Sequence, residues 1–321
     1  MLSFSSVTKN ELSRIDSQDN ECSLAELAAL VRMNGSIQIN GLRRMNLKFS
    51  TENAALARRI FSLIKELYNI QTEVMVRRNK QLKKNNNYII LIDYSNKAEE
   101  VLIDTGVLEI DDNGNYNMNY SIPDSIISTR NCQRAYIRGA FLGGGSISNP
   151  EKTYHLEFVT NSEEHSKDLC NLINTFGLNA KIVLRKDNYI VYLKEGEQIV
   201  DLLNIIQAHN ALLKLEDIRI LKEMRNNINR IVNCETANLS KTINASIRQI
   251  TNIEYIESVL GINKLPENLI DTANLRLENR DASLKELGEM LNPPVGKSGV
   301  NHRLRKLDEI ADDLRMKGEQ K

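Results

Sequence analysis

The chain contains an internal repeat, and this repeat constrains its fold more than any other feature. Residues 22–37 and residues 132–147 are both of helix length and both end in Gly-Ser-Ile, 110 residues apart. The similarity continues downstream, where residues 47–51 align with residues 156–160 at an offset of 109. Chance rarely keeps an offset nearly constant over several elements, so we infer that one structural unit has been duplicated.

The residues after this alignment predict the same elements in both copies. Apolar side chains spaced i, i+3, i+4 and i+7 indicate one face of a helix in each copy: Ile60, Leu63, Ile64 and Leu67, then Leu169, Leu172, Ile173 and Phe176. Short segments rich in β-branched and aromatic residues predict strands around 74–76, 88–92, 183–184 and 189–193. Each copy is therefore predicted to run helix, strand, strand, helix, strand, strand. Two unrelated α+β units are the alternative.

The first helix of each copy carries small side chains that would let two helix backbones approach closely. They are Ala25, Ala28 and Ala29 in the first copy and Ala135, Gly139 and Ala140 in the second. We predict that these two helices pack together across a pseudo-two-fold axis. Ser23 and Glu26 have the spacing of a capping box, which predicts that the first helix begins there.

Composition limits the classes of protein that fit this sequence. The 321 residues include 42 Lys+Arg and 42 Asp+Glu, so the net charge of zero indicates no particular partner. No apolar run approaches the roughly 18 residues of a membrane span, and the first residues lack the features of a secretory signal. We expect a cytoplasmic protein. With four His and no C-x-x-C pair, we expect no zinc site and cysteines that pack as small apolar groups: Cys22, Cys132, Cys170 and Cys234.

The last third of the chain is predicted to be helical. One helix is expected from Lys214 towards Ile231 and another from about Thr236 to Leu260, as a connector that ends at Gly261. Three further helices follow. A capping box of Ser283 with Glu286 begins the second, a loop over residues 292–297 contains two prolines, and Ser298 is expected to cap the third. Val300, Leu304 and Leu307 should face inward on that third helix.

The outward face of the third helix is basic, as expected for the DNA-reading helix of a helix-turn-helix. In that motif the last helix enters the major groove, its early residues meet base edges, and its cations meet phosphates. Asn and Arg have the bidentate geometry that adenine and guanine require. The candidate DNA contacts are Ser283, Lys285, Lys297, Ser298, Asn301, His302, Arg303, Arg305 and Lys306. A solvated basic face on an ordinary three-helix bundle is the alternative.

A second basic group falls in the first repeat, where two strands are expected to join. These residues could contact backbone phosphates, although a basic hairpin tip is usually only solvated. The candidates are Arg43, Arg44, Arg77, Arg78, Lys80, Lys83 and Lys84.

Residues 27–35 and 137–145 resemble the paired helix ends of the LAGLIDADG homing endonucleases. In that family an acid precedes the final glycine of each helix, and the two carboxylates hold the divalent metals that activate water for phosphodiester cleavage. The matching residues here are Asn34 and Gly144, so neither helix end supplies a carboxylate. Glu52 and Glu157 lie on other elements. We therefore expect no catalytic residue, no metal and no cofactor.

Residues 134–148, 283–288 and 297–306 resemble the WhiA family of bacterial regulators, and the resemblance extends over about residues 1–316. Members combine a degenerate LAGLIDADG domain with a C-terminal helix-turn-helix. The resemblance implies binding to double-stranded DNA, and a role in cell division, chromosome segregation or sporulation-linked transcription regulation at the nucleoid.

Together these features predict an α+β fold, a duplicated LAGLIDADG-like αββαββ pseudo-dimer followed by an all-α helix-turn-helix domain. The expected boundaries are 1–125 for repeat 1 with an N-terminal extension, 126–213 for repeat 2, 214–264 for the helical linker and 265–321 for the DNA-binding domain. The leading hypothesis is a non-enzymatic DNA-binding protein that uses the duplicated domain as a scaffold or interaction surface. A metal-dependent nuclease with non-standard acids, or a scaffold for a transcription or division protein, are the alternatives. We expect no membrane partner and no small-molecule substrate.

Overall fold

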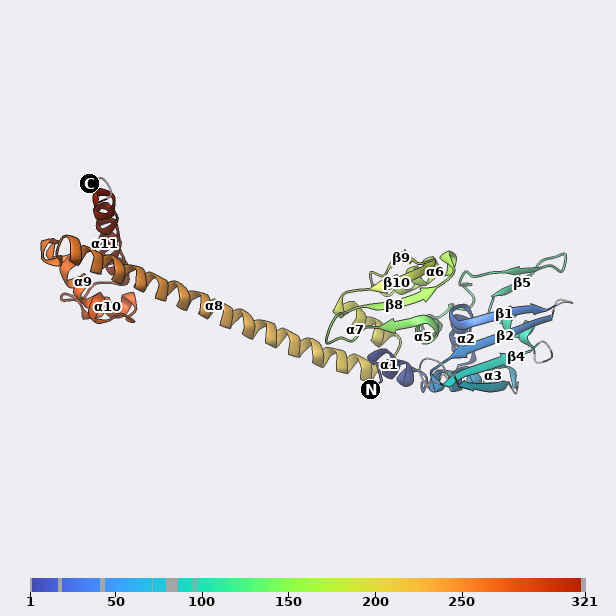
Figure 1. Cartoon of the computed structure of the whole chain (residues 1–321). Helices are drawn as coiled ribbons and strands as arrows, with labels where there is room; N and C mark the ends of the chain where they lie inside the picture. Colours follow the sequence, from blue (N-terminus) through green and yellow to red (C-terminus); the bar gives the residue numbers. More distant parts are fainter. Residues whose placement is uncertain are drawn as a thin grey trace. The chain divides into compact units, whose positions relative to one another are not determined.

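The computed structural model describes residues 2–16, 19–40, 44–70, 72–78, 86–93, 95 and 97–318 (Figure 1). The chain forms two compact units, Met1–Lys222 and Glu223–Lys321. The boundary falls within helix α8 (His209–Val259). Each unit has its own cluster of buried apolar side chains.

The first unit contains two copies of one element order, which confirms the predicted duplication. The first copy is α2 (Asn20–Asn34), β1 (Gly35–Asn40), β2 (Arg44–Thr51), α3 (Ala54–Tyr68), β3 (Glu73–Arg78) and β4 (Asn86–Ile92). The second copy is α5 (Arg130–Gly144), β7 (Gly145–Ile147), β8 (Leu156–Thr160), α6 (Glu163–Asn174), β9 (Lys181–Arg185) and β10 (Asn188–Leu193).

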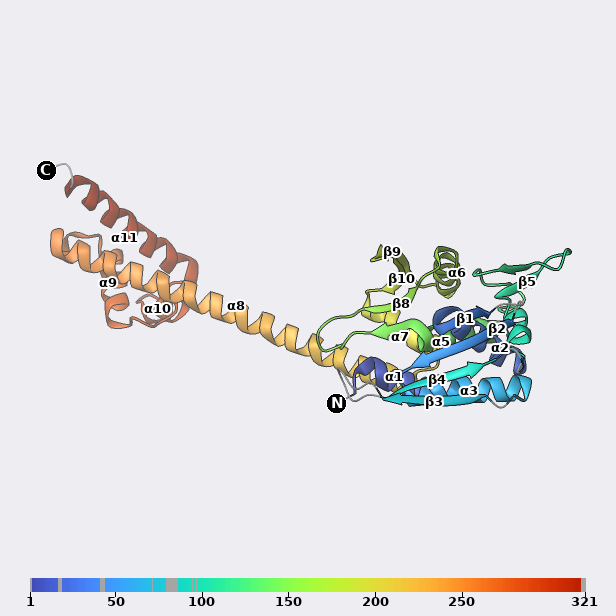
Figure 2. The same ribbon diagram turned by 45° about the vertical axis from the view of Figure 1, so that its right-hand side comes forward.

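The two copies also share strand order and register. Their antiparallel sheets run β1-β2-β4-β3 and β7-β8-β10-β9. Gly35 pairs with Phe49 in the first sheet, and the equivalent Gly145 pairs with Phe158 in the second. A one-residue slip would turn the buried side chains of a strand to the opposite face, so an identical register places equivalent residues in both cores. Helix α3 covers the first sheet, as Figure 2 shows, and α6 covers the second.

Shorter elements complete the first unit around the two repeats. Helix α1 precedes the first repeat and packs against α3 and α5. A helix and a two-stranded hairpin connect the repeats, and one further helix follows the second. Their bounds are α1 (Phe4–Leu12), α4 (Ala98–Asp104), β5 (Leu108–Ile110), β6 (Tyr116–Met118) and α7 (Gly196–Ile205).

Helices α2 and α5 pack directly against each other, as their small residues predict. The Cβ of any other residue at Gly139 would clash with the carbonyl oxygen of Glu26 and lie 3.0 Å from the Cβ of Ala29. Glycine at this position therefore permits the backbones to approach. The alanines that the sequence analysis singled out on both helices are all buried.

The predicted start of α2 is wrong. The helix begins at Asn20, and its N-cap is Asp19, whose Oδ1 accepts a hydrogen bond from the backbone N–H of Glu21 at 3.0 Å. Ser23 and Glu26 lie inside the helix and are fully buried. Glu26 has another role, because its carboxylate is held by two arginines from neighbouring helices.

The second unit consists of the C-terminal part of α8 and the small helical domain that follows. Its elements are a 3₁₀ turn, η3 (Ile262–Lys264), then α9 (Glu267–Glu278), α10 (Leu284–Met290) and α11 (Lys297–Gly318). The prediction of two connector helices was wrong, since α8 is one helix of 51 residues. No glycine or proline lies within its sequence, so nothing local ends it. Among the described residues, no helix combines the length and apolar character needed to cross a membrane.

Candidate nucleic-acid interface

The paired ends of α2 and α5, where homing endonucleases hold metal, carry no carboxylate in this chain. The side-chain amide of Asn34 donates to the carbonyl of Ser50 at 3.3 Å, and its oxygen is buried without a hydrogen-bond partner among the described residues. A Cβ at Gly144 would clash with Met33 Cε and lie 2.7 Å from the carbonyl oxygen of Val159. An acid therefore has no room at this position unless the surrounding backbone moves.

The two nearby acids that the sequence analysis named, Glu52 and Glu157, lie outside the two helices. Glu157 accepts a hydrogen bond from Ser146 Oγ at 3.2 Å, and its other oxygen lies 3.1 Å from His155 Nε2. Glu52 follows β2 and lines a cleft with Arg14 and Arg58, in which it is the one acid among the described lining residues. Glu157 is not among the described residues that line this cleft.

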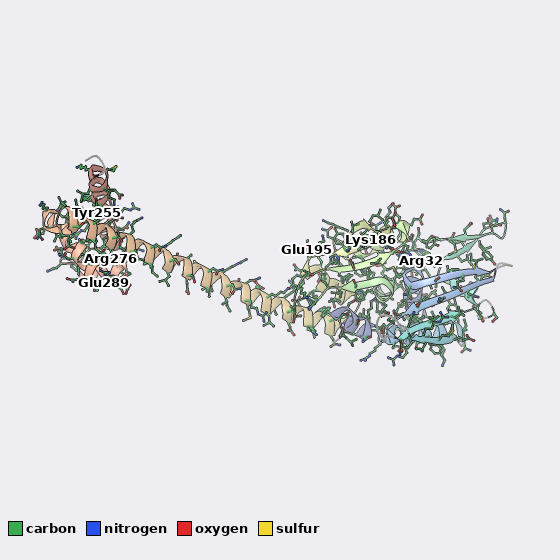
Figure 3. The ribbon with its side chains drawn as sticks, viewed as in Figure 1. Arg32, Lys186, Glu195, Tyr255, Arg276 and Glu289 are labelled. Atoms are coloured by element: carbon green, nitrogen blue, oxygen red, sulfur yellow. The ribbon has the colours of Figure 1, made fainter. Side chains whose placement is uncertain are left out.

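In the first repeat, Arg32 lies in the LAGLIDADG-like motif at residues 27–35, and its side chain makes structural contacts. Its guanidinium donates to the carbonyl oxygens of Thr105, Gly106 and Ser121 at 2.8, 3.0 and 2.9 Å. Burial lowers the pKa of Arg32 below its usual value. The labelled side chain in Figure 3 belongs to α2, and it ties that helix to the connection between the repeats. The arrangement is structural.

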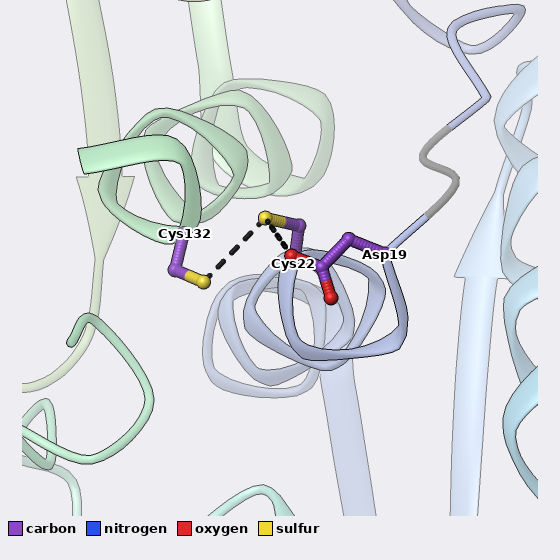
Figure 4. A group of neighbouring side chains, drawn as sticks. All are labelled: Asp19, Cys22 and Cys132. Atoms are coloured by element: carbon purple, nitrogen blue, oxygen red, sulfur yellow. Dashed lines mark hydrogen bonds between the residues drawn. The ribbon is translucent and has the colours of Figure 1, made fainter. Parts of the chain in front are cut away.

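Three of the cysteines are buried, as expected of small apolar groups, but the expectation is wrong for Cys234, which is exposed on α8. Two of the buried cysteines also contact each other. Cys22 and Cys132 belong to the first turns of α2 and α5, and their sulfur atoms lie 3.5 Å apart (Figure 4). Their sequence separation equals the repeat offset, a signal that could have predicted the contact. With Asp19 they form the one group of three possible metal ligands among the described residues. Burial, followed by the hydrogen bond with Cys132, raises the pKa of Cys22 to about 12, so this thiol keeps its proton at neutral pH.

The second unit has the three helices of the predicted helix-turn-helix, α9, α10 and α11. The predicted inward residues of α11, Val300, Leu304 and Leu307, are buried in its core. The predicted capping box begins α10: Glu286 N–H donates to Ser283 Oγ at 3.3 Å, and Ser283 N–H donates to Glu286 Oε2 at 2.7 Å. These hydrogen bonds hold the pKa of Glu286 below its usual value.

The start of α11 differs from the prediction. The helix begins at Lys297, and the carbonyl of Gly296 accepts hydrogen bonds from the N–H groups of Gly299 and Val300 at 2.9 and 3.1 Å. Ser298 is therefore in the first turn and is not the cap. Because the loop ends in a glycine rather than at the first serine, the pattern of capping residues misled the prediction by two residues.

The predicted DNA contacts differ in exposure. Six of them are exposed: Lys285, Lys297, Ser298, His302, Arg305 and Lys306. Ser283, Asn301 and Arg303 are half-buried. Arg303 turns back onto α9, where its Nη1 lies 3.3 Å from the carbonyl oxygen of Asn268 and 3.4 Å from Thr272 Oγ1.

One cleft of about 500 Å³ brings five of the predicted residues together. They line its wall from α11 and from the start of α10: Ser283, Lys285, Lys297, Asn301 and Arg305. The opposite wall belongs to α8 and includes Lys241 and Arg248, which the sequence analysis missed. Their spacing of seven residues, two helical turns, puts both cations on one face of the helix and could have been noticed.

The basic group in the first repeat falls largely outside the described residues. Arg77 is on β3, paired with Asn87 of β4, and is exposed. The backbones of Arg44 and Arg78 lie in strands, but their side chains are outside the described part, as are Arg43, Lys80, Lys83 and Lys84 entirely. A phosphate role for this group stays a prediction.

Comparison with known families and proteins gives similarity along nearly the whole chain. Three family models match: the WhiA N-terminal LAGLIDADG-like domain over residues 20–108, the WhiA LAGLIDADG-like domain over 133–225, and the WhiA C-terminal HTH domain over 228–311. A protein of Alkaliphilus metalliredigens named "Probable cell division protein WhiA" is 62% identical, over 98% of this chain and 99% of its own. A protein of Clostridium novyi with the same name is 53% identical, over 99% of this chain and 100% of its own.

Solved structures give the same result for the fold. The full-length WhiA protein of Thermatoga maritima is 27% identical with a TM-score of 0.60, and the similarity covers 97% of this chain and 99% of that one. A structure of the N-terminal LAGLIDADG domain of WhiA is similar in fold, with a TM-score of 0.50 over 64% of this chain and 90% of that one.

Proposed function

This chain belongs to the WhiA family, and from that premise we propose that it is a non-enzymatic protein that binds duplex DNA at the nucleoid and acts in cell division. The observation that carries the proposal is the capped helix-turn-helix, whose second and third helices present cations on one exposed surface. Between Ser283 and Lys306 the chain has five basic residues and two acids, although its overall charge is zero. Such a local surplus of positive charge attracts the phosphate backbone.

We assign separate roles to the residues of α10 and α11. Asn301 and His302, early in α11, would meet base edges in the major groove, the role of early residues in the third helix of this motif. The exposed cations Lys285, Lys297, Arg305 and Lys306 would contact phosphates and position the helix. Arg303 supports this surface through its contacts with α9 unless DNA draws its side chain away.

The duplicated unit serves, in this proposal, as a scaffold and does not cut DNA. A two-metal nuclease needs anionic oxygens next to the scissile phosphate, and the helix ends provide an amide at Asn34 and no side chain at Gly144. The clash of a Cβ at Gly144 also argues against a simple substitution by an acid. The buried carboxylate of Glu26 instead holds α2 to α3 and α5, and the half-buried Arg32 ties α2 to the connection between the repeats.

The test of binding is a double variant, Arg305→Ala with Lys306→Ala, in the full-length protein. We expect affinity for a random-sequence duplex to fall about tenfold or more at low salt, and the dependence of log K on log salt to become shallower by about 0.9 for each phosphate that the variant no longer touches. Lys264→Ala with Lys317→Ala removes the same charge from exposed positions outside the cleft and serves as the matched control. Equal binding by both double variants would contradict the proposal.

A separate variant tests whether Asn301 recognises the DNA sequence. Asn301→Ala should reduce discrimination between a duplex enriched by the wild-type protein and a scrambled one by about 1–3 kcal/mol, while affinity for the scrambled duplex changes little. Competition binding measures both values. A uniform loss of affinity on both duplexes would assign Asn301 to positioning rather than to reading.

The nuclease alternative is tested on supercoiled plasmid with Mg²⁺ or Mn²⁺. We expect the plasmid to remain supercoiled. Metal-dependent nicking that disappears in Glu157→Gln or Glu52→Gln would overturn the non-enzymatic part of the proposal.

A further inference from the structure

The cleft of the second unit has two walls. The helix-turn-helix forms one wall, and α8, which lies outside that motif, forms the other. On one side are Lys285 of α10 and Lys297 and Arg305 of α11, and on the other are Lys241 and Arg248 of α8. The volume between them is about 500 Å³. Helix α8 thus continues the basic surface of α10 and α11.

The charge of this cleft is strongly positive. Six cationic side chains line it, and Asp308 is the one acid among the described lining residues. Asp308 is already engaged, because Arg248 lies 3.2 Å from its Oδ2 and Asn252 donates to its Oδ1 at 2.7 Å. One carboxylate cannot neutralise six cations, so the cleft favours an anion.

Two buried polar atoms in the lining lack partners. Arg276 is 2% exposed; its Nη1 donates to the carbonyl oxygen of Ala282 at 2.7 Å, but its Nε has no hydrogen-bond partner among the described residues. Gln249 is 6% exposed, and its side-chain oxygen also has no partner there, but this oxygen only accepts hydrogen bonds and an anion would not satisfy it. A buried N–H without a partner is costly, and an anion that accepted from Arg276 Nε would reduce that cost.

From this arrangement we propose that the cleft holds a phosphate of the DNA backbone beside the major-groove site, with α8 as a second DNA-contacting element. The inference rests on the proposed function, because the cleft shares Lys285, Lys297 and Arg305 with the surface that meets the duplex. Lysine and arginine offer only hydrogen-bond donors, and the planar guanidinium fork matches phosphate oxygens. A duplex lying along α11 would bring a backbone phosphate to the cleft, so the cleft needs no ligand other than DNA.

Contacts of this kind position a protein and read no sequence. Removal of the α8 cations should therefore weaken binding to every duplex by the same factor. It should also reduce the number of counterions released, which makes the salt dependence shallower. These two effects distinguish the α8 cations from Asn301, whose substitution should lower the affinity for preferred DNA sequences.

The experiment uses the full-length protein with Lys241→Gln and Arg248→Gln together. We expect affinity for both an enriched duplex and a scrambled duplex to fall roughly three- to tenfold at low salt, and the slope of log K against log salt to decrease by about 0.9 to 1.8, as for one or two phosphates. Lys264→Gln with Lys317→Gln is the matched control, and circular dichroism checks that each variant is folded.

The outcomes distinguish this inference from the function on which it rests. If the α8 variant binds with unchanged affinity and slope while Arg305→Ala with Lys306→Ala binds weakly, the α8 contact is wrong and the proposed function stands. If neither variant loses affinity, the proposed function fails. A third arm adds inorganic phosphate without DNA: if millimolar phosphate raises the melting temperature of the wild type but not of the α8 variant, and DNA binding is unchanged in that variant, the cleft is a site for free phosphate and the duplex assignment is overturned.

Discussion

The charged side chain of Glu26 links three helices of the first unit. Its carboxylate is fully buried; one oxygen accepts from Arg59 Nε at 2.8 Å, and the other accepts from Arg138 Nε at 2.9 Å. Arg59 belongs to α3 of the first repeat and Arg138 to α5 of the second. The ion cluster therefore connects the two repeats, and its cations are buried with it.

Removing this charge should be strongly destabilising. Glu26→Gln leaves two buried guanidiniums without a counter-charge at that position, so we expect the free energy of unfolding to fall by about 3–5 kcal/mol. Urea unfolding followed by circular dichroism measures the change. Glu21→Gln, at an exposed position in the same helix, is the control. A decrease below about 1 kcal/mol would show that the cluster contributes little.

The four thiols should differ in reactivity. Cys234 is exposed and the other three are buried. The raised pKa of Cys22, about 12, leaves almost no thiolate at neutral pH, and thiolate is the reactive form. We therefore expect iodoacetamide to modify one site per native chain, at Cys234, with Cys22 becoming reactive only as pH rises towards its pKa. Mass spectrometry of native and of Cys234→Ser protein checks this; rapid modification of Cys22 at neutral pH would contradict it.

At the scale of elements, the contact between α2 and α5 depends on the absence of one side chain. At Gly139 a Cβ would clash with the backbone of Glu26. Gly139→Val should therefore force the helices apart and destabilise the first unit by about 1–3 kcal/mol or more. Thermal unfolding measures the effect. Gly296→Ala is the comparison, since a Cβ there meets no heavy atom within 4 Å; equal destabilisation in both variants would show that close approach is not the cause.

The elements of the repeats could be predicted from sequence because each carries its own signal. The apolar spacing of α3 and α6, the strand segments and the Gly-Ser-Ile ends all repeat, so each copy supports the interpretation of the other. The start of α2 could not be predicted reliably. Ser23 and Glu26 have the spacing of a capping box, but Glu26 is instead held by tertiary contacts with Arg59 and Arg138.

In the candidate site, too, the features that follow from local sequence patterns were predicted, and those that depend on tertiary packing were not. The capping box of Ser283 and the inward face of α11 are local patterns, and both were predicted. The inward turn of Arg303 onto Asn268 and the second wall of the cleft, with Lys241 and Arg248, depend on how helices distant in sequence pack. The seven-residue spacing of Lys241 and Arg248 indicates a shared helix face, but no local spacing shows which helix that face packs against.

At the scale of the whole molecule, two separate apolar cores share one chain. The first core includes residues of both repeats, such as Leu27 and Phe141, and the second includes Ile256, Leu287 and Leu304. A domain usually unfolds as one unit when a single core holds it together, and a chain with two cores need not do so. Changes in one core should therefore leave the other in place.

Scanning calorimetry tests this independence in the full-length protein. We expect two transitions, and we expect Glu26→Gln to lower the melting temperature of one of them only, because Glu26 belongs to the first unit. Added duplex DNA should raise the other transition, because a ligand stabilises the unit that binds it. Affinity for DNA should be close to that of the wild type below both transitions. A single transition that moves as a whole in Glu26→Gln would mean that the two cores unfold together, and that the nuclease-like unit stabilises the DNA-binding unit directly.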